Sequence, residues 1–369
     1  MIFPSIARTS FSSRRWGLAT LAGCCVLVAG AWVAAAQGGA SVDVLDRGSG
    51  KVVAVARGMV SGVASQGGRL VAVGPRGLIL LSEDGGVKWR QVASPVAADL
   101  VTVRFVGPAT VWAVGHDSVA LRSVDGGASW ERMLDGRAVL RLLNESASRS
   151  DAMQREIGRT MAQSATKDVW PAPLLDIRFS ADGQNGFAVG AFGLILRTID
   201  GGRRWETWLD RAENERRYHL YALAGNDGNV YIAGEQGMVL RLDAAGQRFV
   251  RVETPYNGSF FGIDQVGSRL VAYGLRGNAF VSQDGGRQWQ KIETGTDANL
   301  VTAVARGDSL LLVSQSGDVL SVNFNDGRAA SVAAAPGAEV YGAVLAGANH
   351  LALARLNGVG TVALPVESK

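Results

Sequence analysis

Histidine, cysteine and acidic side chains are the groups of this 369-residue chain that could carry catalysis or bind a metal. The three histidines show no paired metal-ligand spacing: His116, His219 and His350. The sequence has no Gly-x-Ser-x-Gly, Walker or His-Glu-x-x-His motif. The stretch Asn323–Gly327 has part of a calcium-loop pattern but lacks the full loop. We therefore predict a protein that is not an enzyme and that has no metal and no cofactor.

The charge balance indicates that the chain after residue 36 has no large excess of basic residues that could form a nucleic-acid-binding surface. Of the 37 basic residues, three lie in the first 36 positions, which contain no acid, so the remainder carries 34 basic against 33 acidic groups. Phosphate binding needs a concentrated basic patch, and we predict no nucleic-acid partner. The only cysteines, Cys24 and Cys25, also lie in the N-terminal stretch, so the remainder contains no disulfide.

The first 36 residues have the pattern of an export signal. Arg14 and Arg15 precede an uncharged run, Trp16–Ala36, that ends in three alanines. This pattern predicts a secretory signal peptide cleaved after Ala36. The 21-residue run is also long enough to remain as an N-terminal membrane anchor.

Two further interpretations of this segment remain open. Leu21-Ala22-Gly23-Cys24 resembles a bacterial lipobox, which would put a lipid on Cys24, although the sequence after it stays apolar. Ser13-Arg14-Arg15 resembles a twin-arginine signal, with Gly17 where that signal prefers Phe. All these interpretations predict a periplasmic or otherwise extracytoplasmic protein, with residues 16–36 as its anchor if they are retained.

A unit of about 40 residues recurs along the rest of the chain. Its clear copies are Val71–Trp89, Trp112–Trp130, Ala188–Trp205 and Ala272–Trp289, and weaker ones are Ile232–Phe249, Leu312–Gly327 and Tyr341–Val362. Each unit contains four short strands, which in the second copy are Leu100–Val106, Thr110–Val114, Val119–Ser123 and Ser129–Met133. Gly- and Asp-rich links join them as antiparallel hairpins. Stacking such sheets around an axis buries both faces, so we predict an all-β, seven-bladed β-propeller over residues 37–369.

An Asp-Gly-Gly-x-x-Trp turn closes the clear copies. The aspartate can accept hydrogen bonds from its own turn, the glycines adopt positive φ without strain, and the tryptophan opens the last strand. Because the motif recurs around the ring, we assign it a structural role. The residues concerned are Asp84, Trp89, Asp125, Trp130, Asp200, Trp205, Asp284 and Trp289.

Closure of the ring is expected to involve both ends of the domain. The last copy supplies strands near 341–347, 350–356 and 359–364 and then ends. The segment Lys51–Ala56 is expected to add its missing outer strand, which would protect a sheet edge.

The repeat is interrupted between blades 2 and 3. Trp130 and Trp205 are 75 residues apart, and the additional segment, Gly136–Trp170, has few β-branched residues. Met153, Ile157 and Met161 follow one another at i, i+4 and i+8, which predicts an amphipathic helix. We therefore expect a short helical insertion at 137–170, which either packs back on the propeller or binds a partner.

Strand direction places the insertion on one face of the ring. Links between blades share this face with the turns inside the Val-Gly-x-x-Gly motifs, and the Asp-Gly-Gly turns lie opposite. We therefore list as candidate partner-binding residues Arg76, His116, Met153, Ile157, Met161 and Arg276.

The repeat resembles that of a known family. AVGAFGLILRTIDGGRRW, residues 188–205, is most similar to the repeat of the photosystem II assembly and stability factors of cyanobacteria and chloroplasts, and the similarity covers roughly Met59 to Gly327. The resemblance implies a seven-bladed propeller that assists assembly of a membrane complex from the lumenal side. The helical insertion departs from the photosynthetic pattern.

Ser82-x-Asp84-x-Gly86-x-x-Trp89 also matches the Asp box of bacterial neuraminidase repeats. Sialidase catalysis uses an arginine trio, a Tyr–Glu pair and an acidic Asp, and the sequence lacks an Arg-Ile-Pro-type entry to that trio. We predict an exported, non-catalytic scaffold, monomeric by itself, that binds a membrane protein complex on its extracytoplasmic side and assists its assembly or stability. The alternative is a sialidase-like glycoside hydrolase or a glycan-binding propeller.

Overall fold

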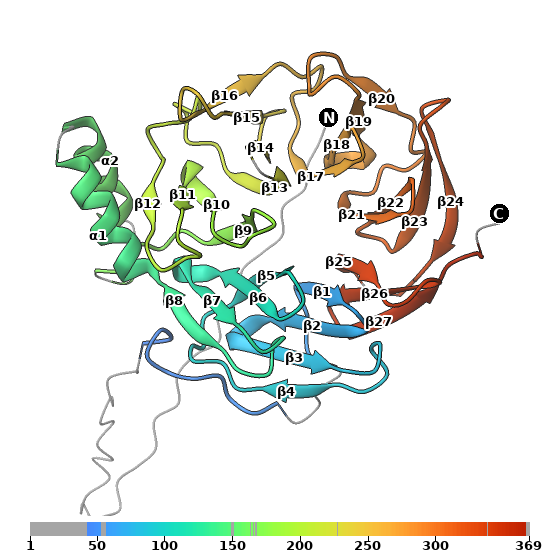
Figure 1. Cartoon of the computed structure of the whole chain (residues 1–369), viewed down its shortest axis with the longest axis horizontal. Helices are drawn as coiled ribbons and strands as arrows, with labels where there is room; N and C mark the ends of the chain where they lie inside the picture. The colour runs from blue at the N-terminus through green and yellow to red at the C-terminus, as the bar shows by residue number, and fades with distance from the viewer. Residues whose placement is uncertain are drawn as a thin grey trace, which may run out of the picture. The chain divides into compact units, whose positions relative to one another are not determined.

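Seven small antiparallel sheets surround a central axis (Figure 1). Within each sheet the strands pair in chain order, from the innermost strand at the axis to the outermost. The predicted seven-bladed β-propeller with four-stranded antiparallel blades is therefore confirmed. The seventh sheet contains three strands in the described part of the chain.

The blades follow the chain order. Blade 1 contains β1 (Gly62–Gln66), β2 (Arg69–Gly74), β3 (Leu78–Ser82) and β4 (Arg90–Val92); blade 2 contains β5 (Leu100–Val106), β6 (Thr110–Gly115), β7 (Ala120–Ser123) and β8 (Glu131–Leu134). Blade 3 contains β9 (Leu174–Phe179), β10 (Gly186–Gly190), β11 (Ile195–Thr198) and β12 (Glu206–Thr207); blade 4 contains β13 (Leu220–Asn226), β14 (Asn229–Gly234), β15 (Val239–Asp243) and β16 (Arg248–Val252). Blade 5 contains β17 (Phe260–Val266), β18 (Arg269–Gly274), β19 (Ala279–Ser282) and β20 (Gln290–Ile292); blade 6 contains β21 (Leu300–Arg306), β22 (Ser309–Ser314), β23 (Asp318–Asn323) and β24 (Arg328–Ala334). Blade 7 contains β25 (Val340–Leu345), β26 (His350–Arg355) and β27 (Gly358–Ala363).

The computed structural model describes residues 43–52, 57–148, 151–162, 164, 166, 168–226, 228–337 and 339–366. The side chains at 152, 153, 156 and 226 are outside this description, and so is the predicted leader, residues 1–36. No helix in the described part is both long and apolar enough to cross a membrane.

The two faces of the ring differ in their turns. Short 3-10 turns follow the second strands of several blades: η1 (Pro75–Gly77), η2 (His116–Ser118), η3 (Ala191–Gly193) and η4 (Leu275–Gly277). These turns bond to the links between blades, as where the His116 N–H donates to the Asp99 carbonyl at 2.8 Å. We call this side the insert face. The Asp-Gly-Gly turns bond instead to the hairpins between first and second strands, as where the Gly85 N–H donates to Gly68 at 2.9 Å, and we call that side the Asp-box face.

Each Asp box is closed by its own hydrogen bonds. Asp84 Oδ1 accepts from the amides of Val87 (3.1 Å) and Lys88 (2.9 Å), and the Ser82 hydroxyl accepts from Gly86 (2.9 Å). Trp89 Nε1 donates to the Gly86 carbonyl at 3.0 Å, which fastens the indole to the turn. The turns of Asp125 and Asp200 repeat both the aspartate and the tryptophan bonds. In the Asp284 turn the aspartate bonds recur, but the indole N–H of Trp289 is buried without a partner.

Acid is expected to destabilise the propeller through these turns. The Ser129 hydroxyl lowers the pKa of Asp125 to about 2, and hydrogen bonds also lower the pKa of Asp84, Asp200 and Asp284. Carboxylates with a folded pKa below the unfolded value of about 3.9 stabilise the fold above that value. We therefore expect the free energy of unfolding, measured by urea titration, to fall as the pH decreases from about 4 towards 2. Asp125→Asn should flatten this decrease, and an unchanged slope would contradict the assignment.

The insertion forms a helical hairpin, α1 (Gly136–Ala147) and α2 (Asp151–Ala162), beside blades 2 and 3 (Figure 1). Asp135 caps α1 by accepting a hydrogen bond from the Ala138 amide at 3.0 Å. The apolar side of the hairpin packs into one cluster with blades 2 and 3, through the buried residues Val139, Leu143, Ala147 and Ile157. The hairpin therefore extends the hydrophobic core.

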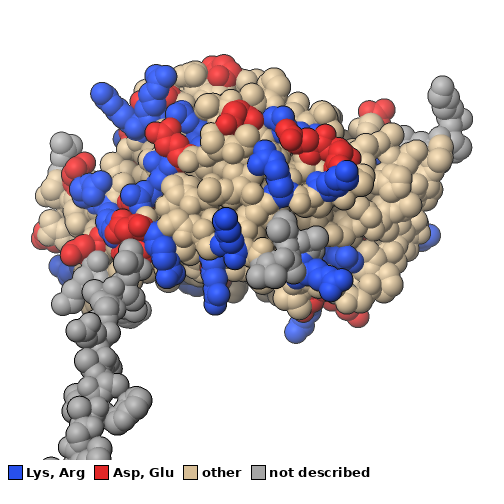
Figure 2. Space-filling model, turned by 90° about the horizontal axis from the view of Figure 1, so that it is seen from below, with Lys and Arg blue, Asp and Glu red and all other residues tan. Residues whose placement is uncertain are grey.

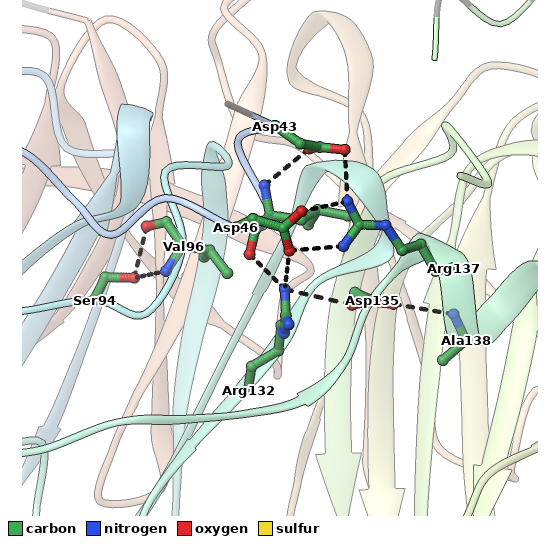
Figure 3. Close-up of polar contacts among 9 residues, drawn as sticks. Asp43, Asp46, Ser94, Val96, Arg132, Asp135, Arg137 and Ala138 are labelled. Atoms are coloured by element: carbon green, nitrogen blue, oxygen red, sulfur yellow. Dashed lines mark hydrogen bonds and ion pairs between the residues drawn. The ribbon is translucent and has the colours of Figure 1, made fainter. Parts of the chain in front are cut away.

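Residues 43–52 run along blade 1 and are clamped to the base of α1 (Figure 3). Arg137 pairs with Asp43 and Asp46 at 2.7 Å each, and Arg132 donates to the Leu45 carbonyl. The hydrogen bond and charge of Arg137 lower the pKa of Asp46. Leu45, 1% exposed, packs among residues of blades 1 and 2.

The described part of the ring closes through direct packing of blades 1 and 7. Val60, Leu70 and Ala72 form one cluster with Ala352 and Ala354, and the Val60 N–H donates to the Arg355 carbonyl at 3.0 Å. Of the predicted closing strand Lys51–Ala56, residues 53–56 lie outside the described residues. Lys51 and Val52 are not in a strand, and the Val52 N–H donates at 2.8 Å to Gln91 in blade 1. For these two residues the prediction of an outer strand on blade 7 is wrong, because the segment follows the outer strand of blade 1.

Charged side chains of both signs are interspersed over the surface that Figure 2 shows. Many pair at exposed sites, as in Arg69–Glu83 (2.9 Å) and Lys291–Glu293 (3.3 Å). Such pairs contribute about 0–1 kcal/mol each because water and salt screen them.

Candidate functional site at the mouth of the central channel

A β-bulge opens most of the innermost strands on the insert face. In blade 2, for example, Leu100 pairs with Gly115 and Thr102 with Val114, so Val101 has no partner. A bulge leaves one residue unpaired and re-aims its side chain. In blade 1 the corresponding residue is Ser61, whose hydroxyl donates to the Leu100 carbonyl at 2.5 Å. The bulged residues are Val101, Leu175, Tyr221, Phe261, Val301 and Tyr341.

All seven of these side chains line one cavity of about 660 Å³ that runs along the axis. All are partly exposed, and six of the seven are apolar or aromatic. We call this set, Ser61 together with the six bulged residues, the mouth ring. Every blade contributes one member, so a ligand entering from the insert face would contact the whole circle.

An aromatic cluster extends the mouth ring outward over blades 3 to 5. Phe192, which is 45% exposed, lies in the turn η3 with φ 56°, a conformation that is strained for a bulky side chain. Its N–H donates to Nδ1 of His219 at 3.2 Å, and the two rings lie 5.2 Å apart. Tyr221 meets Phe261 edge-on at 5.6 Å. Burial, and then Glu235, raise the pKa of Tyr221 to about 12, so its hydroxyl stays protonated.

Below the mouth ring the channel contains an ion pair, Arg104–Asp176, whose carboxylate is buried. Asp176, 3% exposed, accepts from Nε of Arg104 at 2.5 Å and from its Nη2 at 2.8 Å. The backbone amides of Leu223 and Ile177 also donate to Asp176, each at 2.8 Å. Burial disfavours the charge of Arg104, but the charge and hydrogen bonds of Asp176 outweigh it and raise the pKa of Arg104.

A second polar pair, Asp264 and Tyr273, also lines the channel. The Tyr273 hydroxyl donates to Asp264 Oδ2 at 2.8 Å. Burial raises the pKa of Asp264 and that of Tyr273. Among the described residues, no group of three or more His, Cys, Asp or Glu could hold a metal ion. The channel wall therefore contains two hydrogen-bonded polar pairs beneath a largely apolar mouth.

The structure places the predicted partner-binding residues apart from the channel. Arg76 and His116 lie together, because Asp99 accepts from the amides of both, through Oδ1 (2.7 Å) and its carbonyl (2.8 Å). Arg276 lies in blade 5 beside Asn299, to which its N–H donates at 3.1 Å. All three are on the insert face, as the strand count predicted, but none lines the channel.

The predicted partner-binding residues of the insertion are less available still. Ile157 is buried in the cluster of blades 2 and 3, and Met161 packs partly against it. Ile157 therefore cannot offer a surface to a partner, because the helix folds back on the propeller. The side chain of Met153 lies outside the described residues.

Sequence reasoning missed the channel residues, although a signal for part of the mouth ring was present. Tyr221, Phe261, Val301 and Tyr341 follow one another at intervals of 40 residues. Each stands directly after the first residue of its inner strand. No such 40-residue spacing identifies Arg104, Asp176 or Asp264 as channel residues.

Comparison with known proteins agrees with this architecture. Residues 163–322 match the family model described as photosynthesis system II assembly factor YCF48. The chain is 27% identical over 146 residues to the photosystem II assembly lipoprotein Ycf48 of Synechococcus sp. (strain CC9902), a match that covers 39% of this chain and 43% of that protein. It is 29% identical over 150 residues to the same protein of Trichormus variabilis, covering 37% and 44%. The matches thus span less than half the length of these curated relatives.

A solved structure titled "YCF48 bound to D1 peptide" shares the fold, with a TM-score of 0.59, 14% identity, and coverage of 84% of this chain and 95% of that one. The Asp boxes, the ring of seven blades and the family match all depend on the same repeated unit of the sequence. The chain is therefore a seven-bladed β-propeller whose residues 163–322 are similar to the photosystem II assembly factor family.

Proposed function

We propose that this propeller binds a segment of a membrane protein subunit at the mouth ring and assists the assembly or stability of that subunit's complex. The observation that carries the proposal is the circle of seven partly exposed side chains, mostly apolar, around one opening. Exposed aromatic groups gathered on one face are typical of protein-binding surfaces. The structural relative with a bound D1 peptide supports a peptide or protein segment as the ligand.

The protein acts outside the cytoplasm and without catalysis in this proposal. The leader pattern of residues 1–36 supports export, and the curated relatives are called lipoproteins, which supports a membrane-anchored location. The channel gives little support to the sialidase alternative, because Asp176 already engages Arg104 through two hydrogen bonds. Mass spectrometry of the mature N-terminus would distinguish cleavage after Ala36, lipidation of Cys24 and a retained anchor.

Recovery of a membrane subunit from detergent-solubilised membranes tests the binding site. We expect Tyr221→Ala/Phe261→Ala to reduce recovery at least about tenfold, since the pair removes two aromatic contacts at the centre of the surface. The matched control is Val124→Ala/Ile199→Ala, which removes two exposed apolar side chains (64% and 63%) from the Asp-box face. Equal recovery by both double variants would contradict the proposal.

A further inference from the structure

The spaces between neighbouring blades are filled by a recurring set of three side chains. Between blades 2 and 3 these are Trp112 of the second strand, the Asp-box residue Trp205 and Phe179 of the inner strand. Trp112 stacks on Phe179 with ring centroids 5.0 Å apart and meets Trp205 edge-on at 6.2 Å. Between blades 1 and 2 the equivalent positions hold Val71, Trp130 and Phe105, which share one cluster.

Between blades 3 and 4 one member of this set is absent and the other two are smaller, and a cavity of about 230 Å³ remains. Gly225 stands where Phe179 stands in blade 3, and Phe249 stands where the Asp box of blade 3 has Trp205. Gly225 has φ 82°, and a Cβ there would lie 1.8 Å from the Asn229 carbonyl oxygen, so no larger residue fits. Phe249 packs against Phe187 at 5.2 Å between ring centroids, the contact that Trp205 makes with Trp112 in the neighbouring space, here with two smaller rings.

The cavity combines an apolar wall with guanidinium groups. Phe187, Val230 and Leu242 supply apolar surface, and Arg197 lies 4.8 Å from the ring centroid of Trp208. Arg178 lines both this cavity and the channel.

Arg178 has an incomplete set of partners. Its Nε donates to the Gly225 carbonyl at 2.6 Å, and no carboxylate of the described residues lies within ion-pair distance of it. Burial, and then the nearby Arg104, lower the pKa of Arg178, and the more distant charges of Asp176 and Asp264 offset this only in part. An anion placed against its remaining N–H groups would relieve this cost and form charge-assisted hydrogen bonds.

We propose that the cavity between blades 3 and 4 binds a small carboxylate with a compact apolar body, such as a one-ring aromatic acid. The carboxylate pairs with Arg178, and the ring lies against Phe187, Val230 and Leu242. The volume is below the roughly 300–1,000 Å³ of pockets for drug-sized ligands, which suits a single ring. This site opens at the seam between two blades and is separate from the mouth ring.

Titration of the full protein with benzoate, followed by calorimetry and tryptophan fluorescence, tests this inference. We expect saturable binding at one site, and binding of the neutral benzamide at least about tenfold weaker, because it cannot form the charge-assisted pair. Inorganic phosphate, which has no apolar body, should also bind at least about tenfold more weakly than benzoate. Benzoate and benzamide binding equally would overturn the proposal.

Two variants locate the site. Arg178→Gln should weaken benzoate binding at least about tenfold, and Phe187→Trp should abolish it by filling the cavity as Trp112 fills the neighbouring seam. Arg122→Gln is the matched control. Arg122 lies at the filled space between blades 2 and 3, at the strand position that Arg197 has at the cavity between blades 3 and 4. This substitution should leave binding unchanged.

If a folded Phe187→Trp protein still bound benzoate, the proposed site would be wrong. Such a result would include the possibility that benzoate reaches Arg178 from the channel. If Phe187→Trp does not fold, Arg178→Gln and the benzamide comparison decide. The mouth-ring variant Tyr221→Ala/Phe261→Ala should bind benzoate normally, so failure of this inference and failure of the proposed function are distinguishable.

Discussion

Replacing Trp112 with alanine is expected to lower the free energy of unfolding by about 4 kcal/mol. The side chain is 1% exposed and lies between blades 2 and 3, where it contacts Phe179 and Trp205. A Cβ on Gly202 would lie 2.4 Å from the indole, which shows how tightly the opposite turn closes on it. Little rearrangement could refill the space, so the loss should include both the transfer term and most of the cavity term. Urea unfolding at constant m-value measures it.

Val87→Ala provides the control for this substitution. Val87 lies in an Asp-box turn and is 78% exposed, so its truncation should change the free energy of unfolding by less than about 0.5 kcal/mol. If Trp112→Ala lowered the free energy of unfolding by no more than about 1 kcal/mol, the aromatic side chains between blades would contribute little to the stability of the propeller.

The fold was predictable because its determinants are local and repeated. The predicted strand Leu100–Val106 coincides with β5, and the other strands predicted for that copy lie within two residues of the observed bounds. Alternating apolar residues, tight Gly-rich turns and the Asp box act over a few positions, and the repeat supplies each signal several times. Even the weak last copy was placed correctly, as β25, β26 and β27.

The site was less predictable because it depends on register and on contacts between blades. A bulge at Val101 is decided by how β5 pairs with β6, which the composition of either strand does not specify. Arg104 and Asp176 are 72 residues apart and belong to different blades. The helical period around Ile157 correctly indicated an apolar face, but it could not show that blades 2 and 3 cover that face.

Replacing Asp176 with alanine is expected to lower the free energy of unfolding by about 3 kcal/mol. The substitution leaves Arg104 without its carboxylate and removes the acceptor of two backbone amides, Leu223 and Ile177. The side chain of Arg104 is 36% exposed, so water can compensate part of its charge, and we expect the lower end of the range for buried pairs. Urea unfolding measures this loss as well.

The two partners of this pair should not be equivalent. Arg104→Met leaves Asp176 with both amide donors, so it should cost only about 1–2 kcal/mol. Lys291→Ala, which breaks an exposed pair with Glu293, should cost less than about 0.5 kcal/mol. Equal losses from Asp176→Ala and Arg104→Met would mean that the ion pair alone stabilises this part of the channel. The expected asymmetry would instead assign to Asp176 a wider role, because its carboxylate ties the inner strands of blades 2, 3 and 4 together beneath the mouth ring.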